Sequence, residues 1–284
     1  MSTIVVGLDA SPEARDALQW ACSYARPDDA IVAVRAFEMQ WIGLAGMAVP
    51  VTPDDFELTA REALEKLLGE VADPRVTAVV REGRPGPVLV AEAERADLVV
   101  VGHRGDSRVA MMLGSTANYV LHHNTVPTVV VRGERSGGGE PIRRVVVGVD
   151  DQDLEDGGNA SVRALQWAYA VPGVEHILVA NAWHVPPMAV GVYPAIAADF
   201  EALDQAAFAA VDRVVTAAGP APDGVTIEPA SLRGTAGWAL VEASADADLV
   251  VVGSRGVSTL RGLLLGSTSA ELAAHAHSPV CVIR

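Results

Sequence analysis

The sequence predicts two α/β domains, each built on an open parallel β-sheet with helices on both faces. Short runs rich in valine, such as residues 98–101, are typical of strands that are buried on both faces. Segments with the helical spacing of apolar residues separate these runs, and this alternation favours parallel strands joined by right-handed crossovers. Nearly the whole pattern occurs twice within the 284 residues, which indicates a duplicated domain.

The repeat is clearest around the fourth strand expected in each half. Residues 96–131 and 247–283 share Ala-Asp-Leu-Val-Val-Val-Gly, then x-Arg-Gly, then Leu-Gly-Ser-Thr and a valine-rich end. A glycine-rich segment, GERSGGGEP, lies between the halves and has the composition of a linker. We therefore expect a first domain at 1–133, a linker at 134–142 and a second domain at 143–284.

The elements of the first half alternate between strand and helix. The expected strands are residues 3–8, 30–37, 76–80, 98–101 and 128–131, and the expected helices are residues 13–25, 53–70, 87–95 and 115–123. Ser11 suits the N-cap of the first helix, and Pro12 suits its first position. Residues 38–52 are apolar but show no period, so they either pack on their own domain or a partner, or cover a ligand as a flap.

The second half repeats this order with one insertion. Asp9 lies nine residues before Leu18, whereas Asp150 lies fifteen residues before Leu165, so six residues have been added there. The expected elements include strands at 177–183, 225–231, 249–252 and 280–283, and a long helix at about 195–218. Pro229 has no N–H to donate, so the strand that contains it must lie at the edge of its sheet.

Each half carries a glycine motif directly after its fourth strand. In the second half Gly253 and Gly256 enclose two residues, and nine residues separate Gly256 from Gly266; in the first half, eight residues separate Gly105 from Gly114. A Gly-Ser-Thr sequence then begins a helix, where free N–H groups and the helix dipole favour an anion. The alternative is that the glycines only make turns and that Ser or Thr only caps the helix.

These motifs resemble those of the universal stress protein family. The shared features are a Val-Gly-x-Asp turn after the first strand, at Asp9 and Asp150, and the pattern Gly-x2-Gly-x9-Gly-[Ser/Thr]. The first half departs from the pattern by one residue. The resemblance implies a Rossmann-like fold of the adenine nucleotide alpha hydrolase type with strand order 3-2-1-4-5. It also implies that the ligand is ATP, with or without Mg²⁺.

In such a sheet the ligand binds where the winding reverses, between strands one and four. The resemblance implies that Asp9 and Asp150 contact the nucleoside and that Ala36 and Ala182 flank the adenine. The residues implied to hold the phosphates are Gly102, Gly105, Gly114, Ser115 and Thr116 in the first half and Gly253, Gly256, Gly266, Ser267 and Thr268 in the second. Arg104 and Arg255 either pair with a phosphate or are ordinary solvated charges.

The amino-acid composition limits the kinds of molecule that we expect the protein to bind. The net charge of −15 argues against nucleic acid and anionic membranes, because both require basic surfaces. Cys22 and Cys281 lie in apolar runs, which indicates buried thiols rather than a disulfide framework or a metal site. The first residues have neither a basic region nor a long apolar run of the kind found in signal peptides, so we expect a cytoplasmic protein.

Three functions are compatible with the sequence. The first is an ATP-binding stress-response or signalling module, with tighter binding in the second half because its glycine motif is complete. The second is a slow ATPase that uses the same sites without a dedicated catalytic residue, since neither motif carries the lysine of a P-loop. The third is a nucleotide-free protein that forms a homodimer, or pairs its own two domains, through strands 128–131 and 280–283.

Overall fold

The computed structural model describes residues 1–38, 53–105, 113–132, 141–151, 154, 160–185, 199–254 and 265–284. These residues divide into two compact units, one containing Met1–Val131 and the other containing residues 141–284. All of the expected flap except Glu38, most of the insertion after Asp150, Arg255 and Gly256 lie outside the described residues.

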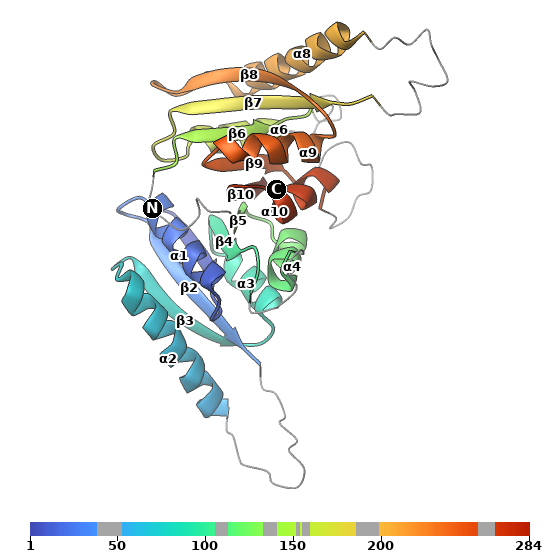
Figure 1. Cartoon of the computed structure of the whole chain (residues 1–284). Helices are drawn as coiled ribbons and strands as arrows, with labels where there is room; N and C mark the ends of the chain where they lie inside the picture. The colour runs from blue at the N-terminus through green and yellow to red at the C-terminus, as the bar shows by residue number, and fades with distance from the viewer. Residues whose placement is uncertain are drawn as a thin grey trace. The chain divides into compact units, whose positions relative to one another are not determined.

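The first domain alternates strand and helix as expected (Figure 1). Its elements are β1 (Thr3–Gly7), α1 (Pro12–Tyr24), β2 (Ala30–Phe37), α2 (Pro53–Val71), β3 (Val76–Glu82), α3 (Pro85–Ala93), β4 (Leu98–Gly102), α4 (Ser115–His123) and β5 (Thr128–Val131). The strands pair in the order β3-β2-β1-β4-β5, and every pairing is parallel. The crossovers run one way to β2 and β3 and the other way to β4 and β5, so the winding reverses between β1 and β4.

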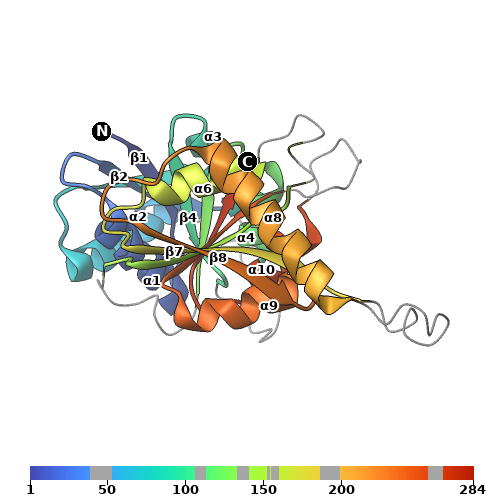
Figure 2. The same ribbon diagram turned by 90° about the horizontal axis from the view of Figure 1, so that it is seen from above.

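The second domain repeats this topology. Its elements are β6 (Arg144–Gly148), α6 (Ala160–Tyr169), β7 (His176–Trp183), α8 (Phe200–Ala218), β8 (Thr226–Arg233), α9 (Ala236–Ala243), the short 3₁₀ helix η2 (Ser244–Asp246), β9 (Leu249–Gly253), α10 (Ser267–His275) and β10 (Val280–Ile283). The strands pair in the order β8-β7-β6-β9-β10, again in parallel. Figure 2 shows α8 on one side of β7 and β8, and α9 and α10 on the other.

The predicted fold class and strand order are confirmed in both domains. Pro229 lies in β8, the edge strand of the second domain, which pairs only with β7. The missing N–H of Pro229 therefore breaks no hydrogen bond to a strand on the other side. The valine runs of β4 and β9 are buried, as expected for strands covered on both faces. Among the described residues, no helix combines the length and the apolar character needed to cross a bilayer.

The two cysteines differ in their surroundings. Cys281 is fully buried in β10, as expected, whereas Cys22 is only partly buried. The carbonyl of Cys22 accepts a hydrogen bond from Arg75 (2.7 Å), and the same guanidinium pairs with Asp73 at 2.5 Å. Arg75 therefore ties the end of α1 to the segment that enters β3, and its hydrogen bond lowers the pKa of Asp73 to about 2.

Candidate functional site

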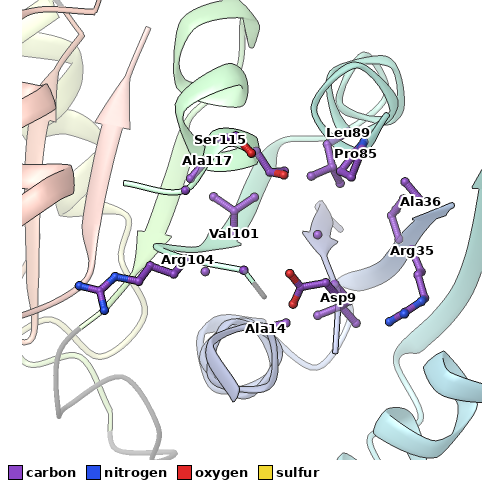
Figure 3. A pocket seen from close by; sticks show the side chains of 17 residues that line it. Asp9, Ala14, Arg35, Ala36, Pro85, Leu89, Val101, Arg104, Ser115 and Ala117 are labelled. Atoms are coloured by element: carbon purple, nitrogen blue, oxygen red, sulfur yellow. The ribbon is translucent and has the colours of Figure 1, made fainter. Parts of the chain in front are cut away.

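A cavity of about 300 Å³ lies at the carboxyl ends of β1 and β4, where the winding of the first domain reverses. We call it the first cavity. All seven positions predicted for the first half line it: Asp9, Ala36, Gly102, Gly105, Gly114, Ser115 and Thr116. They come from the ends of β1, β2 and β4 and from the start of α4. Figure 3 shows Asp9 and Ser115 on opposite sides of this cavity.

Asp9 is held in place by Ser11. The backbone N–H and the hydroxyl of Ser11 both donate to Asp9 Oδ1, the first at 2.9 Å, and the same hydroxyl accepts from the N–H of Ala14 as the N-cap of α1. The other carboxylate oxygen lies against Gly105, because a Cβ added at Gly105 would collide with Asp9 Oδ2. The first glycine loop therefore needs glycine here to approach the carboxylate.

The ends of the first glycine loop close on each other. The N–H of Gly114 donates to the carbonyl of His103 at 2.8 Å. A Cβ built on Gly114 would lie 3.6 Å from the nitrogen of Gly105. In the second domain the N–H of Gly266 donates to the carbonyl of Ser254 at 2.9 Å. The shorter glycine loop of the first domain is thus closed by the same backbone hydrogen bond as the longer glycine loop of the second domain.

The helix that follows each loop has no side-chain cap. Gly114 is the N-cap of α4 and Gly266 is the N-cap of α10, and neither position has a side chain to accept from the first turn. The first N–H groups of a helix have no partner within it, and the positive end of the helix dipole lies there. Both helices therefore present backbone donors to the cavities beside them.

Several lining residues were not predicted. In the first cavity they include Ala14, Arg35, Pro85 and Leu89. Arg104 also borders this cavity, but Figure 3 shows its side chain turned away from Asp9 and Ser115. Comparing the two halves position by position would have directed attention to Arg35, because the repeat places Asn181 opposite it.

The second domain has a cavity of about 280 Å³ in the equivalent place. We call it the second cavity. Of the seven predicted positions, Asp150, Ala182, Gly253, Gly266, Ser267 and Thr268 line it, and Gly256 lies outside the described residues.

The aspartate of the second cavity is fixed through its backbone. The hydroxyl of Ser161, which is buried, accepts from the N–H of Asp150 and donates to its carbonyl, both at 2.9 Å. Ser161 takes the place in the repeat that Ala14 has in the first domain. Asn181 is also fixed, since its side-chain amide donates to the carbonyl of Val149 at 2.8 Å.

Each cavity combines backbone donors at a helix N-terminus with one lining aspartate, Asp9 or Asp150. Within the described ranges, no group of three or more His, Cys, Asp or Glu side chains is arranged to hold a metal ion. His123 lies at the end of α4, where its ring stacks on Tyr119 with a centroid distance of 4.0 Å. The ring of His123 therefore packs within its own helix.

The comparisons with known proteins agree with the two-domain organisation. The model of the universal stress protein family matches residues 1–132 and 141–284. A universal stress protein of Mycolicibacterium smegmatis is 30% identical over 99% of this chain and 96% of its own length. A universal stress protein of Mycobacterium tuberculosis strain H37Rv is also 30% identical, with the same coverage.

Among solved structures, the crystal structure of a universal stress protein from Archaeoglobus fulgidus is similar over the whole chain. It has a TM-score of 0.66 and 19% sequence identity, and the alignment covers 100% of this chain and 96% of that chain. This likeness agrees with the Rossmann-like fold described above.

Proposed function

Because the chain belongs to the universal stress protein family as a tandem member, we propose that it is a nucleotide-binding stress-response or signalling module with ATP as its ligand. One observation carries the proposal. All the predicted positions that the structure describes gather at two cavities, each beside an uncapped helix N-terminus. Such an arrangement suits a phosphate group.

The residues have separate tasks in this proposal. The N–H groups and hydroxyls of Ser115 and Thr116 donate to phosphate oxygens in the first cavity, and those of Ser267 and Thr268 do so in the second. The glycines allow the backbone to approach the phosphates closely. Asp9 and Asp150 accept from the ribose hydroxyls, and Ala36 and Ala182 leave room for the base. Mg²⁺ would be held mainly by the phosphates, as is common for this ion.

Hydrolysis is expected to be slow at most. The only lysine of the chain is Lys66, which lies on α2 and not at either cavity. A phosphate-binding lysine therefore contributes to neither site. The output of binding is then a change of conformation or of partner. The homodimer or domain pairing through β5 and β10, and the cytoplasmic location, stay predictions.

The test is mass spectrometry of the nucleotide released when freshly purified full-length protein is denatured, followed by titration of the emptied protein. We expect ATP, at up to two molecules per chain. A protein that is purified empty and also fails to bind added ATP would contradict the proposal and would favour the nucleotide-free assembly.

A further inference from the structure

Ser11 contacts both Asp9 and the first turn of α1. Its N–H and its hydroxyl donate to Asp9 Oδ1, and its hydroxyl oxygen accepts from the N–H of Ala14 at 3.2 Å. Ser11 is only 5% exposed, so water competes little for these hydrogen bonds. The orientation of the Asp9 carboxylate is therefore coupled, through one buried hydroxyl, to the start of a helix.

The two oxygens of the Asp9 carboxylate have different surroundings. Oδ1 accepts both hydrogen bonds from Ser11. Oδ2 lies on the side of Gly105, in the space that a side chain at that position would fill. Asp9 lines the first cavity, and in Figure 3 its carboxylate projects into that cavity. Because the hydrogen bonds from Ser11 use Oδ1, Oδ2 is the oxygen left to accept from a ligand.

A carboxylate oxygen in this position selects a ligand group that has a proton to donate. An ionised carboxylate only accepts hydrogen bonds, and those it accepts are stronger than hydrogen bonds between neutral groups. In ATP the donors are the ribose hydroxyls and the amino group of the base. The proposed function places the phosphates at the start of α4, across the cavity from Asp9 (Figure 3), and the base at Ala36. The ribose is therefore the part of the nucleotide that meets Oδ2.

The hydrogen bonds from Ser11 orient the carboxylate before a ligand arrives. Less ordering is then needed on binding, and this preorganisation increases affinity for a group that fits. A site built to hydrogen-bond a hydroxyl also rejects an analogue that lacks it, because the acceptor is then left without its partner. Ser11 does not itself line the first cavity, so its effect on a ligand must pass through Asp9.

We propose that Ser11 is a positioning residue that makes the first cavity selective for ribonucleotides over nucleotides without ribose hydroxyls. Its hydroxyl holds Oδ1 of Asp9, so that Oδ2 accepts from a ribose hydroxyl. This proposal rests on the proposed function, because it takes the phosphates to lie at the first glycine loop. It adds selectivity for the sugar to the binding of ATP, and it assigns that selectivity to a residue that touches the aspartate and not the nucleotide.

The experiment is equilibrium dialysis of full-length protein against labelled ATP and labelled 2′,3′-dideoxy-ATP. We expect the first cavity of the unmodified protein to bind ATP about tenfold more tightly than the dideoxy analogue. Ser11→Gly removes the hydroxyl but keeps the N–H that donates to Asp9, and glycine is nearly as good an N-cap as serine. This variant should bind ATP about fivefold more weakly at about one site per chain and the dideoxy analogue as before. Ser23→Gly, at the exposed end of the same helix, is the control and should change the binding of neither nucleotide.

Other results would overturn the proposal in distinguishable ways. Equal affinity of the unmodified protein for the two nucleotides would remove the selectivity for the sugar and leave ATP binding intact. An equal loss of both affinities in Ser11→Gly would mean that Ser11 maintains the shape of the cavity and does not act through the carboxylate. Unchanged binding of ATP in this variant would show that the hydroxyl is not needed. Failure of the unmodified protein to bind either nucleotide would remove the proposed function as well.

Discussion

The two domains build equivalent cavities with the same backbone but with different side chains around them. In both, a glycine N-cap follows the fourth strand, and its N–H closes the loop on a carbonyl near the end of that strand. In the first domain Ser11 donates hydrogen bonds to the carboxylate of Asp9, whereas in the second Ser161 hydrogen-bonds with the backbone of Asp150. The comparison teaches that the fold sets the glycine-loop end of each cavity, while the surroundings of the aspartate differ between the two copies.

The largest expected effect comes from Gly105→Ala. The new Cβ would collide with Asp9 Oδ2 and force the carboxylate away from Ser11. We expect nucleotide affinity at the first cavity to fall at least about tenfold, while the second cavity is unaffected. Equilibrium dialysis should then count about one nucleotide fewer per chain than in the unmodified protein.

The matched control is Gly69→Ala on α2, where no atom lies within 4 Å of the added Cβ. This variant should bind as the unmodified protein does. If Gly105→Ala kept the full number of bound nucleotides, Asp9 would have no part in binding. The role proposed for the aspartate of the first domain would then be wrong.

The next prediction compares how much Ser161 and Ser11 contribute to stability. Ser161→Ala removes two hydrogen bonds to the backbone of Asp150, which should cost about 2 kcal/mol of unfolding free energy. Ser11→Ala removes an N-cap and should cost about 1 kcal/mol. Urea unfolding followed by circular dichroism measures both, and Ser23→Ala, an exposed helix position, is the control. Equal losses in the two variants would show that the contact of Ser161 with the backbone of Asp150 adds no more stability than the N-cap of α1.

The smallest effect concerns acid stability. The hydrogen bond from Arg75 lowers the pKa of Asp73 from 3.8 to about 2. Because the pKa is lower in the folded protein, this stabilisation is complete above pH 4 and is lost as the pH falls toward 2. Because the ion pair lies near the surface and solvent screens it, the effect amounts to less than about 1 kcal/mol. In the second domain, Thr226 takes the place of Arg75 in the pairing register.

Asp73→Asn should therefore lower stability at pH 7 and flatten its dependence on pH between about 4 and 2, as measured by urea unfolding at a series of pH values. Glu57→Gln, which breaks an exposed ion pair with Arg61, serves as the comparison and should have little effect. If the stability of Asp73→Asn changed with pH as that of the unmodified protein does, the contact of Arg75 with the end of α1 would not depend on the Asp73 carboxylate.

The sequence predicted the architecture because buried parallel strands and glycine turns leave strong local patterns. The strand order and the edge position of Pro229 followed from these patterns and from the family resemblance, and both are confirmed. The sequence also named the positions that border the cavities, since the ends of parallel strands meet at one edge of a sheet.

The details around those positions could not be predicted. The hydroxyl of Ser161 acts on Asp150 across eleven residues, and this contact depends on where the inserted segment returns to the helix. The eight-residue loop looked like a departure that weakens the first site, yet its ends close as those of the longer loop do.

The state of the two thiols bears on how a protein of this family could receive a stress signal. Burial, together with the nearby Asp73, raises the pKa of Cys22 to about 12, and burial raises the pKa of Cys281 as well. Oxidants and alkylating agents react with the thiolate, which is scarce at neutral pH under these conditions. The chain has no other cysteine. Peroxide should therefore leave both thiols unmodified. If the proposed function is correct, the signal that reaches this protein is a change in the cell's nucleotide pools.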